Sequence, residues 1–315
     1  MHTPQHIAVI STELGISNRQ VEAVAELLSQ EATVPFVARY RKEATGSLDE
    51  VQITAVRDRL GQLAELDRRR ETVLASLEKN GHLTDELRTR VEGAESMAVL
   101  EDIYLPFKPK RRTKASVARE KGLEPLAQAI MAQEGLDPQQ AALAYVDAEK
   151  GVASTEEALE GAGHILAEMI NEDETARGRL RTLFNEKAQM RSTVAAGKEI
   201  EGIKFKDYFD WQEPAAAAPS HRVLAMRRGE REEVLSLSTL PPEEEALAVL
   251  EGLFVKGTGA DSEQVRLAVA DSYRRLLSRS LETELRLALK ERAEAEAIRV
   301  FADNLRELLL ASPLG

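Results

Sequence analysis

The sequence predicts a mainly α-helical, multi-helical protein with a minor β-strand component after residue 230. The composition is 43% hydrophobic and 30% charged, with Ala, Leu, Glu and Arg prominent, which is what amphipathic helices need. Aromatic residues make up only 4%, too little material for a β-sandwich core. Composition changes in the aromatic and alanine-rich stretch 200–219. We therefore expect two helical domains, 1–200 and 201–315.

The N-terminus predicts two short helices joined at Gly15. This glycine is expected to be the C-cap of the first helix, and Ser17 the N-cap of the second. The spacing from Gly15 to Val21 is that of a helix-turn-helix, which would place residues 18–20 at the start of a recognition helix. Simple helix packing explains the same pattern, so both interpretations stay open.

A short basic turn follows between Pro35 and Gly46, and a long helix is expected after it. Ser47 and Glu50 form an S-x-x-E capping box that predicts where this helix starts. Asn80-Gly81 predicts where it ends. The cations of the turn are Arg39, Arg41 and Lys42.

The remaining elements are predicted from caps and periodicity. Thr84 and Ser96 are expected to cap two short helices, and Pro125 suits the first turn of another. Further helices are expected at about 138–149, 155–171, 173–198, 220–228, 261–278 and 281–311. The alternating stretch VLSLSTL is the best strand candidate. The last helix is predicted to carry one apolar face formed by Leu285, Leu289, Ile298, Phe301, Leu305 and Leu308.

The stretch Tyr104–Lys121 concentrates positive charge in an acidic protein. It holds seven Lys/Arg against Glu120, a local charge of +6, so the other 297 residues carry −18 of the total of −12. Pro106 and Pro109 predict an exposed loop in which the residue before each proline is extended. The cations are Lys108, Lys110, Arg111, Arg112, Lys114, Arg119 and Lys121.

Two interpretations of this loop stay open. Its cations could neutralise phosphates while Tyr104 and Phe107 stack on bases, as in single-strand binders. Alternatively, the loop is solvated, or it pairs with the carboxylates of the acidic remainder.

The sequence offers no enzymatic motif. The absence of cysteine excludes disulfides, thiolate metal sites and cysteine nucleophiles. Of the five histidines, only His2 and His6 have the i, i+4 spacing of a ligand pair, and they lie at a terminus without a third ligand nearby. No P-loop, G-x-S-x-G or H-E-x-x-H motif appears. We expect no catalytic residue, no metal and no cofactor. Neither a secretory signal nor a membrane-spanning stretch is recognised, which favours a cytoplasmic protein without membrane contact.

Long segments of the chain resemble the N-terminal part of the bacterial transcription accessory protein Tex family. The segments are VPFVARYRKEATGSLDE (34–50), LEDIYLPFKPKRRTKASVAREKGLEPLA (100–127), KFKDYFDW (204–211), SHRVLAMRRGE (220–230) and LKERAEAEAIRVFADNLRELLLASPLG (289–315). The resemblance implies a cytoplasmic RNA- and DNA-binding protein linked to transcription. It also implies a helix-turn-helix-like element in the helical N-terminal region. An RNase H-like domain, helix-hairpin-helix motifs and a C-terminal OB-fold domain would follow beyond Gly315.

We therefore expect a non-enzymatic helical module with an auxiliary phosphate-contacting surface that binds nucleic acid weakly by itself. The alternative is a protein-docking scaffold for the transcription machinery or for the C-terminal domains. The candidate nucleic-acid-binding residues are Arg39, Arg41, Lys42, Lys108, Lys110, Arg111, Arg112, Lys114 and Arg119. The resemblance assigns none of them an individual role.

Overall fold

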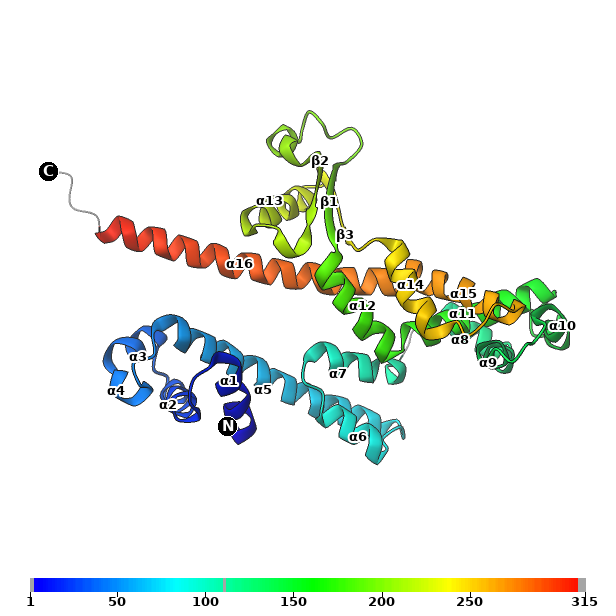
Figure 1. The fold of residues 1–315 in the computed structure, drawn as a ribbon, viewed down its shortest axis with the longest axis horizontal. Coiled ribbons are helices and arrows are strands. Elements are labelled where there is room, and N and C mark those ends of the chain that lie inside the picture. Colours follow the sequence, from blue (N-terminus) through cyan, green and yellow to red (C-terminus); the bar gives the residue numbers. More distant parts are fainter. Residues whose placement is uncertain (1–2, 110–111, 311–315) are drawn as a thin grey trace. The chain divides into compact units, whose positions relative to one another are not determined.

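The computed structural model describes residues 3–109 and 112–310, and its chain forms two compact units, Met1–Lys108 and Pro109–Gly315 (Figure 1). Within the described residues there are sixteen α-helices and one three-stranded sheet, so the prediction of a mainly α-helical protein is confirmed. The division predicted at residue 200 falls inside the second unit and stays a prediction.

The first unit is built on α5, a helix of 30 residues against which α1, α2, α3, α6 and α7 pack, while α4 packs against α2 and α3. One buried cluster joins the N-terminal half of α5 to α1, α2 and α3, and a second joins its C-terminal half to α6 and α7. The elements of this unit are α1 (Pro4–Leu14), α2 (Asn18–Ser29), α3 (Val34–Tyr40), α4 (Lys42–Thr45), α5 (Glu50–Lys79), α6 (Asp85–Glu92), α7 (Met97–Tyr104) and the 3-10 turn η1 (Leu105–Phe107).

The helix ends of the first unit follow local side-chain chemistry, with one correction. Gly15 adopts the left-handed conformation, and the hydroxyl of Ser17 accepts from the Gln20 amide as a capping box requires, so both predicted caps are confirmed. The capping box predicted from Ser47 is wrong. Ser47 lies at φ 66°, and Asp49 caps α5 instead by accepting from the Gln52 amide at 2.8 Å.

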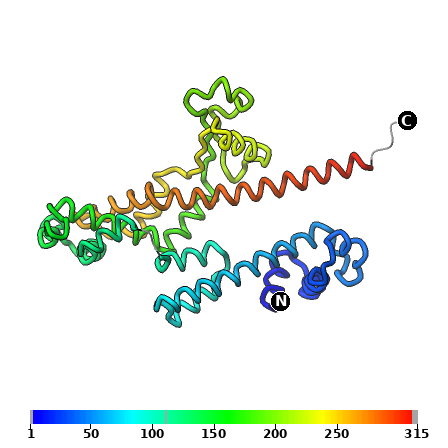
Figure 2. Tube along the Cα trace, turned by 180° about the vertical axis from the view of Figure 1, so that it is seen from behind, coloured from blue at the N-terminus to red at the C-terminus, as the bar shows by residue number. Residues whose placement is uncertain are grey.

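The second unit contains the remaining helices and all the strands. Figure 2 shows α16, the long orange to red helix, running along this unit, while α9, α10 and α11 pack against α15. The elements are α8 (Lys114–Glu120), α9 (Glu124–Ala132), α10 (Pro138–Ala142), η2 (Leu143–Tyr145), α11 (Thr155–Asn171), α12 (Glu174–Lys187), β1 (Gln189–Val194), η3 (Ile203–Tyr208), β2 (Asp210–Pro214), η4 (Ala215–Ala217), α13 (Ser220–Arg231), β3 (Leu235–Leu240), α14 (Glu243–Phe254), α15 (Ala260–Ser272), η5 (Tyr273–Leu277) and α16 (Ser278–Leu310).

The sheet is antiparallel in the order β2-β1-β3. The strand predicted at VLSLSTL is confirmed as β3, but the helix predicted over 173–198 ends at Lys187. Its last part is β1, the central strand, which pairs with β2 from Gln189 opposite Pro214 and with β3 from Gln189 opposite Leu240. A central strand gains hydrogen bonds from both neighbours, and this long-range pairing outweighs the local helical preference.

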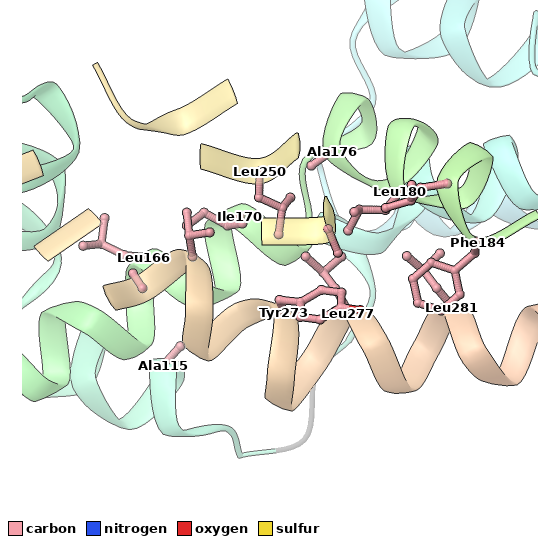
Figure 3. Packing of buried hydrophobic residues seen from close by; sticks show 14 of the residues in the cluster. Ala115, Leu166, Ile170, Ala176, Leu180, Phe184, Leu250, Tyr273, Leu277 and Leu281 are labelled. Carbon is pink, nitrogen blue, oxygen red and sulfur yellow. The ribbon is translucent and has the colours of Figure 1, made fainter. Parts of the chain in front are cut away.

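The core of the second unit runs along α12, η5 and α16. Figure 3 shows Phe184 and Leu180 on α12 facing Leu281 and the neighbouring Leu277 and Tyr273. The helices predicted at 261–278 and 281–311 are joined without a break through the π-helical turn η5.

The predicted apolar face of α16 is divided in two. Leu285 and Leu289 are buried, but burial on this helix ends at Ala293. The predicted face continues over exposed residues, so only its first part contributes to the described core. The exposed members are Ile298, Phe301, Leu305 and Leu308.

The alanine run at 215–218 folds back onto α16. Ala215 and Ala218 are buried, and the Arg292 guanidinium donates to the carbonyl oxygens of both and of Ala216. In the described parts of the chain, none of the helices combines the length and apolar character that crossing a bilayer needs.

Candidate nucleic-acid interface

The valines of helix α3 pack against the core, so its cations and aromatic rings lie on the exposed face. Val34 and Val37 are buried against the first unit's core, each burial stabilising by roughly 1.5–3 kcal/mol. Phe36, Arg39 and Tyr40 then lie on the outer face, since helical neighbours recur at three and four residues.

Arg39, Arg41 and Lys42 are all exposed. Arg41 lies between α3 and α4 at φ −128°, where the helical path breaks, and Lys42 starts α4. Within residues 3–109 and 112–310, no carboxylate lies within 4 Å of the charged nitrogens of these three residues. Their charge therefore faces solvent without a carboxylate partner in the described parts of the chain.

Two aromatic rings lie beside these cations. The ring centroids of Phe36 and Tyr40 are 5.5 Å apart, and the Arg41 guanidinium lies 5.5 Å from the Phe36 centroid. Phe36 is 40% exposed and Tyr40 66% exposed. We call Phe36, Arg39, Tyr40, Arg41 and Lys42 the α3–α4 basic face. The aromatic pair was missed from the sequence, although F-x-x-x-Y at helical spacing among cations was a readable signal.

The start of α2 is tied to this face through Gln20. Its amide nitrogen donates to the Thr45 carbonyl at 3.2 Å, at the end of α4, and its oxygen accepts from the Ser17 amide. Gly46 follows at φ 65°, and a Cβ there would lie 2.9 Å from that Gln20 nitrogen. Gln20 is thus occupied by structural hydrogen bonds, whereas Asn18 and Arg19, at the start of the helix-turn-helix pattern, remain exposed.

At the end of the first unit, Lys108 forms an ion pair within the protein. Its ammonium lies 2.5 Å from a Glu101 carboxylate oxygen, and Arg69 contacts the other oxygen at 2.6 Å. Burial alone would raise the pKa of Glu101, but hydrogen bonds from Arg69 and Lys108 outweigh it and hold that pKa below its ordinary value. Glu101 is therefore ionised at neutral pH and partly neutralises Lys108.

The stacking role considered for Tyr104 is wrong. Its ring is only 6% exposed, its hydroxyl lies 2.7 Å from the Ser76 hydroxyl, and Arg69 and Lys108 cover the ring. Phe107 packs against the same cluster. Because the Tyr104 ring is covered, no external base can stack on it, whereas Phe107 is half-buried.

In the second unit, Arg119 is also engaged. Its guanidinium pairs with Glu168, whose side chain is 9% exposed, and with Glu124 at 3.3 Å. Burial alone would lower the pKa of Arg119, and the hydrogen bond to Glu168 reverses this and raises it. Arg119 thus compensates a buried carboxylate, which is a structural role.

Arg112 and Lys114 are more accessible. Arg112 is 75% exposed and contacts Glu120 at 3.6 Å, whereas the Lys114 ammonium lies 3.5 Å from the His164 imidazole. Lys110 and Arg111 lie outside the described residues. The described site residues thus lie in three places: the α3–α4 basic face and the end of the first unit, where Lys108 pairs with Glu101, and the surroundings of α8 in the second unit. Groups of three or more His, Asp or Glu arranged to hold a metal ion are absent from the described residues.

Comparison with known proteins gives two family matches that together cover most of the chain. Residues 4–78 match the family described as "Tex-like protein N-terminal domain", and residues 133–301 match "Tex central region-like". The chain is 44% identical over 317 residues to Protein YhgF of Escherichia coli and 42% identical over 315 residues to Transcriptional accessory protein Tex of Neisseria gonorrhoeae. Each alignment covers 98% of this chain and 41% of the relative.

A human protein is similar at lower identity. It is named S1 RNA-binding domain-containing protein 1, is 27% identical over 325 residues, and is covered over 32% of its length. The chain therefore spans about two fifths of the length of its bacterial relatives and about one third of the human one.

Proposed function

The chain belongs to the Tex family, and on this premise we propose that it is a non-enzymatic helical module of a transcription-associated accessory protein that binds nucleic acid in the cytoplasm. In this proposal the α3–α4 basic face supplies an auxiliary, sequence-independent contact to RNA or DNA phosphates. The bacterial relative's name places that protein in transcription, and the human relative's name attributes an RNA-binding domain to it.

The observation that carries the proposal is the availability of three neighbouring cations. Arg39, Arg41 and Lys42 are exposed, and no carboxylate in the described chain pairs with them. A net charge of −12 opposes diffuse attraction of a polyanion, so a contact needs a local group of unpaired cations. The α3–α4 basic face is such a group.

The aromatic pair favours single strands over duplexes at this face. Unpaired bases expose their π-faces and stack on aromatic side chains, whereas the bases of a duplex are already stacked. Tyr40 offers such a ring next to Arg39 and Arg41. The backbone would lie along the cations while a base covers Tyr40.

The test is a salt titration of binding. Each phosphate contact on a single strand contributes a slope of about −0.7 to log K against log salt. Changing Arg39, Arg41 and Lys42 together to Gln is expected to reduce the slope by about 2 and to lower affinity for an oligo(dT) or oligo(U) strand roughly thirtyfold at low salt. An unchanged slope would refute the proposal.

A matched control carries the same loss of charge elsewhere. Arg57, Lys187 and Lys290 each pair with a carboxylate of the protein, and changing these three to Gln is expected to leave the slope within about 0.5 of the original. Turnover of labelled RNA or DNA by the chain, with or without added divalent metal, would contradict the non-enzymatic part of the proposal.

A second candidate function is a protein-docking scaffold. The exposed apolar residues near the end of α16 favour it, since Ile298, Phe301, Leu305 and Leu308 recur at helical spacing. Changing Ile298 and Phe301 to Ser should abolish capture of a transcription-machinery partner or of the C-terminal domains without changing the salt slope. Loss of nucleic-acid binding in this variant would contradict the separation of the two surfaces.

A further inference from the structure

A pocket of about 670 Å³ opens between α8 and α11 in the second unit. The start of α8 supplies Arg112, Thr113 and Lys114 to its wall, and Lys121 follows the end of that helix. His164 projects into it from α11. This α8–α11 pocket lies in a different unit from the α3–α4 basic face, so it can be tested independently.

Two basic groups of the pocket, the Lys114 ammonium and the His164 imidazole, lie close together. The Lys114 ammonium lies 3.5 Å from the His164 Nε2, and within the described chain no carboxylate lies within 4 Å of that ammonium. A neutral imidazole can accept a hydrogen bond from this ammonium, whereas two protonated groups this close would repel each other unless an anion lay between them. Lys114 thus has no charge partner among the described residues, and an anionic ligand would supply one.

The nearby carboxylates leave the position beside Lys114 open. Glu160 lies 3.9 Å from the His164 Nε2 and is largely exposed. Glu157 accepts from the Ala153 amide at 2.9 Å. Arg112 reaches Glu120 only at 3.6 Å, and both side chains are well exposed, so this pair costs little to exchange for a stronger anionic partner.

We propose that the α8–α11 pocket binds a phosphate-class oxyanion between Lys114, His164 and Arg112. The lysine and arginine supply fixed positive charge and hydrogen-bond donors, and the guanidinium can hold two oxygens at once. The imidazole adds a third donor when it is protonated. A terminal phosphomonoester fits this set better than an internal phosphodiester, because it carries more charge and three free oxygens. The ligand is either a small phosphate compound or the phosphorylated end of a nucleic acid strand.

Proton uptake should accompany binding. Burial, assisted by the Lys114 ammonium, lowers the pKa of His164, so the ring is neutral at pH 7.5 before an anion binds. The other charged groups facing the ring are Glu160 on its own helix, Asp271 on α15 and Arg275 on η5, the last two paired with each other. A bound dianion favours the imidazolium, so affinity should increase as the pH falls from 8 to 6.

The first experiment uses inorganic sulfate, which does not titrate in this pH range, with the full chain in calorimetry. We expect saturable binding whose heat depends on the ionisation heat of the buffer, and an affinity about tenfold higher at pH 6 than at pH 8. His164→Asn should remove the buffer dependence, and Lys114→Met should abolish binding. Lys150→Met is the matched control, because this exposed lysine pairs with Asp147 and does not line the pocket.

The second experiment identifies the source of the phosphate. A 5′-phosphorylated trinucleotide that binds about tenfold more tightly than its 5′-hydroxyl form, and more tightly than inorganic phosphate, would identify a strand end. Equal binding of inorganic phosphate and the phosphorylated trinucleotide would identify a small phosphate compound. Absence of saturable binding of sulfate, phosphate and the phosphorylated trinucleotide to the folded chain up to about 10 mM would overturn the proposal.

Discussion

Arg39, Arg41 and Lys42 face solvent on α3 and α4, whereas Lys108 and Arg119, in the most basic stretch of the sequence, face carboxylates of the protein. The second region carries more charge, yet two of its described cations are engaged by the protein, while Arg112 and Lys114 stay accessible. Lys108 lies next to Glu101, and Arg119 compensates the buried Glu168. The comparison teaches that the density of cations in a sequence does not measure their availability, because the fold decides which of them meet carboxylates.

The largest expected effect is the loss of stability on replacing Arg119, the cation with a structural role. Arg119→Leu leaves the carboxylate of Glu168 buried without its main charge partner and should lower the free energy of unfolding of the second unit by about 2 kcal/mol, less than for a fully buried pair because Arg119 is partly exposed. The single tryptophan, Trp211, lies in β2, so its fluorescence during urea unfolding reports on this unit.

Arg39→Leu is the matched control from the α3–α4 basic face. This side chain is exposed and has no described ion pair, so we expect a change in stability within about 0.5 kcal/mol, measured by circular dichroism during urea unfolding. If Arg39→Leu lowered the free energy of unfolding more than Arg119→Leu does, the exposed cation would have the larger structural role, which would contradict the comparison.

A smaller effect is expected at the aromatic pair. Tyr40→Leu removes one stacking ring while keeping all the cations, and should lower affinity for a single strand about fivefold. Duplex affinity and the salt slope should stay unchanged, since neither depends on stacking. Fluorescence anisotropy measures both ligands. Tyr40→Phe keeps the ring and should retain single-strand affinity, and an equal loss in Tyr40→Phe would rule out stacking.

The ion pairs around Glu101 predict a specific dependence on pH. The pKa of Glu101 is lowered in the folded protein, so its contribution to stability is complete above the unfolded value near 4.5 and is lost as pH falls through the folded value. Hydrogen exchange of α5 and α7 amides, corrected for intrinsic rates, should show decreasing protection below about pH 4.5. In Glu101→Gln, protection should fall less below this pH. If protection falls as much as in the original chain, other carboxylates cause the loss.

The smallest effect is expected at Lys108. Lys108→Gln removes a cation that already pairs with Glu101, so single-strand affinity should change by less than about twofold. A loss as large as that of the triple α3–α4 variant would place Lys108 in the interface and contradict its structural role.

Much of the fold was predictable because helix ends are determined by neighbouring residues. Gly15, Ser17, Thr84 and Ser96 cap the helices as expected, each through a bond within a few residues. The case of Ser47 shows the limit of such patterns, because Asp49 and Gln52 formed the competing box two residues later. Leu105 shows another limit, since it is helical at ψ −44° despite the following proline, whereas Lys108 is extended as expected.

The strand and the ion pairs that the sequence did not predict depend on residues elsewhere in the chain. Strand β1 forms because β2 and β3, both later in the chain, pair with its two edges. Arg119 is a candidate contact in the sequence because it lies in the basic stretch, and its ion pair is not predictable, since Glu168 lies 49 residues away and no local pattern connects them. The partner of Lys108 is closer, since Glu101 lies seven residues earlier on α7, but Lys108 follows the end of that helix in an extended conformation, so helical spacing does not predict the contact.

The most direct test of the interface is photocrosslinking of the full chain to a single strand that carries a photoreactive base, followed by mass spectrometry of the linked peptides. The account expects crosslinks in residues 34–45, centred on Tyr40, and their loss in the triple Arg39, Arg41 and Lys42 variant. Crosslinks confined to residues 104–121, and unchanged in that variant, would contradict the claim that the α3–α4 basic face contacts nucleic acid.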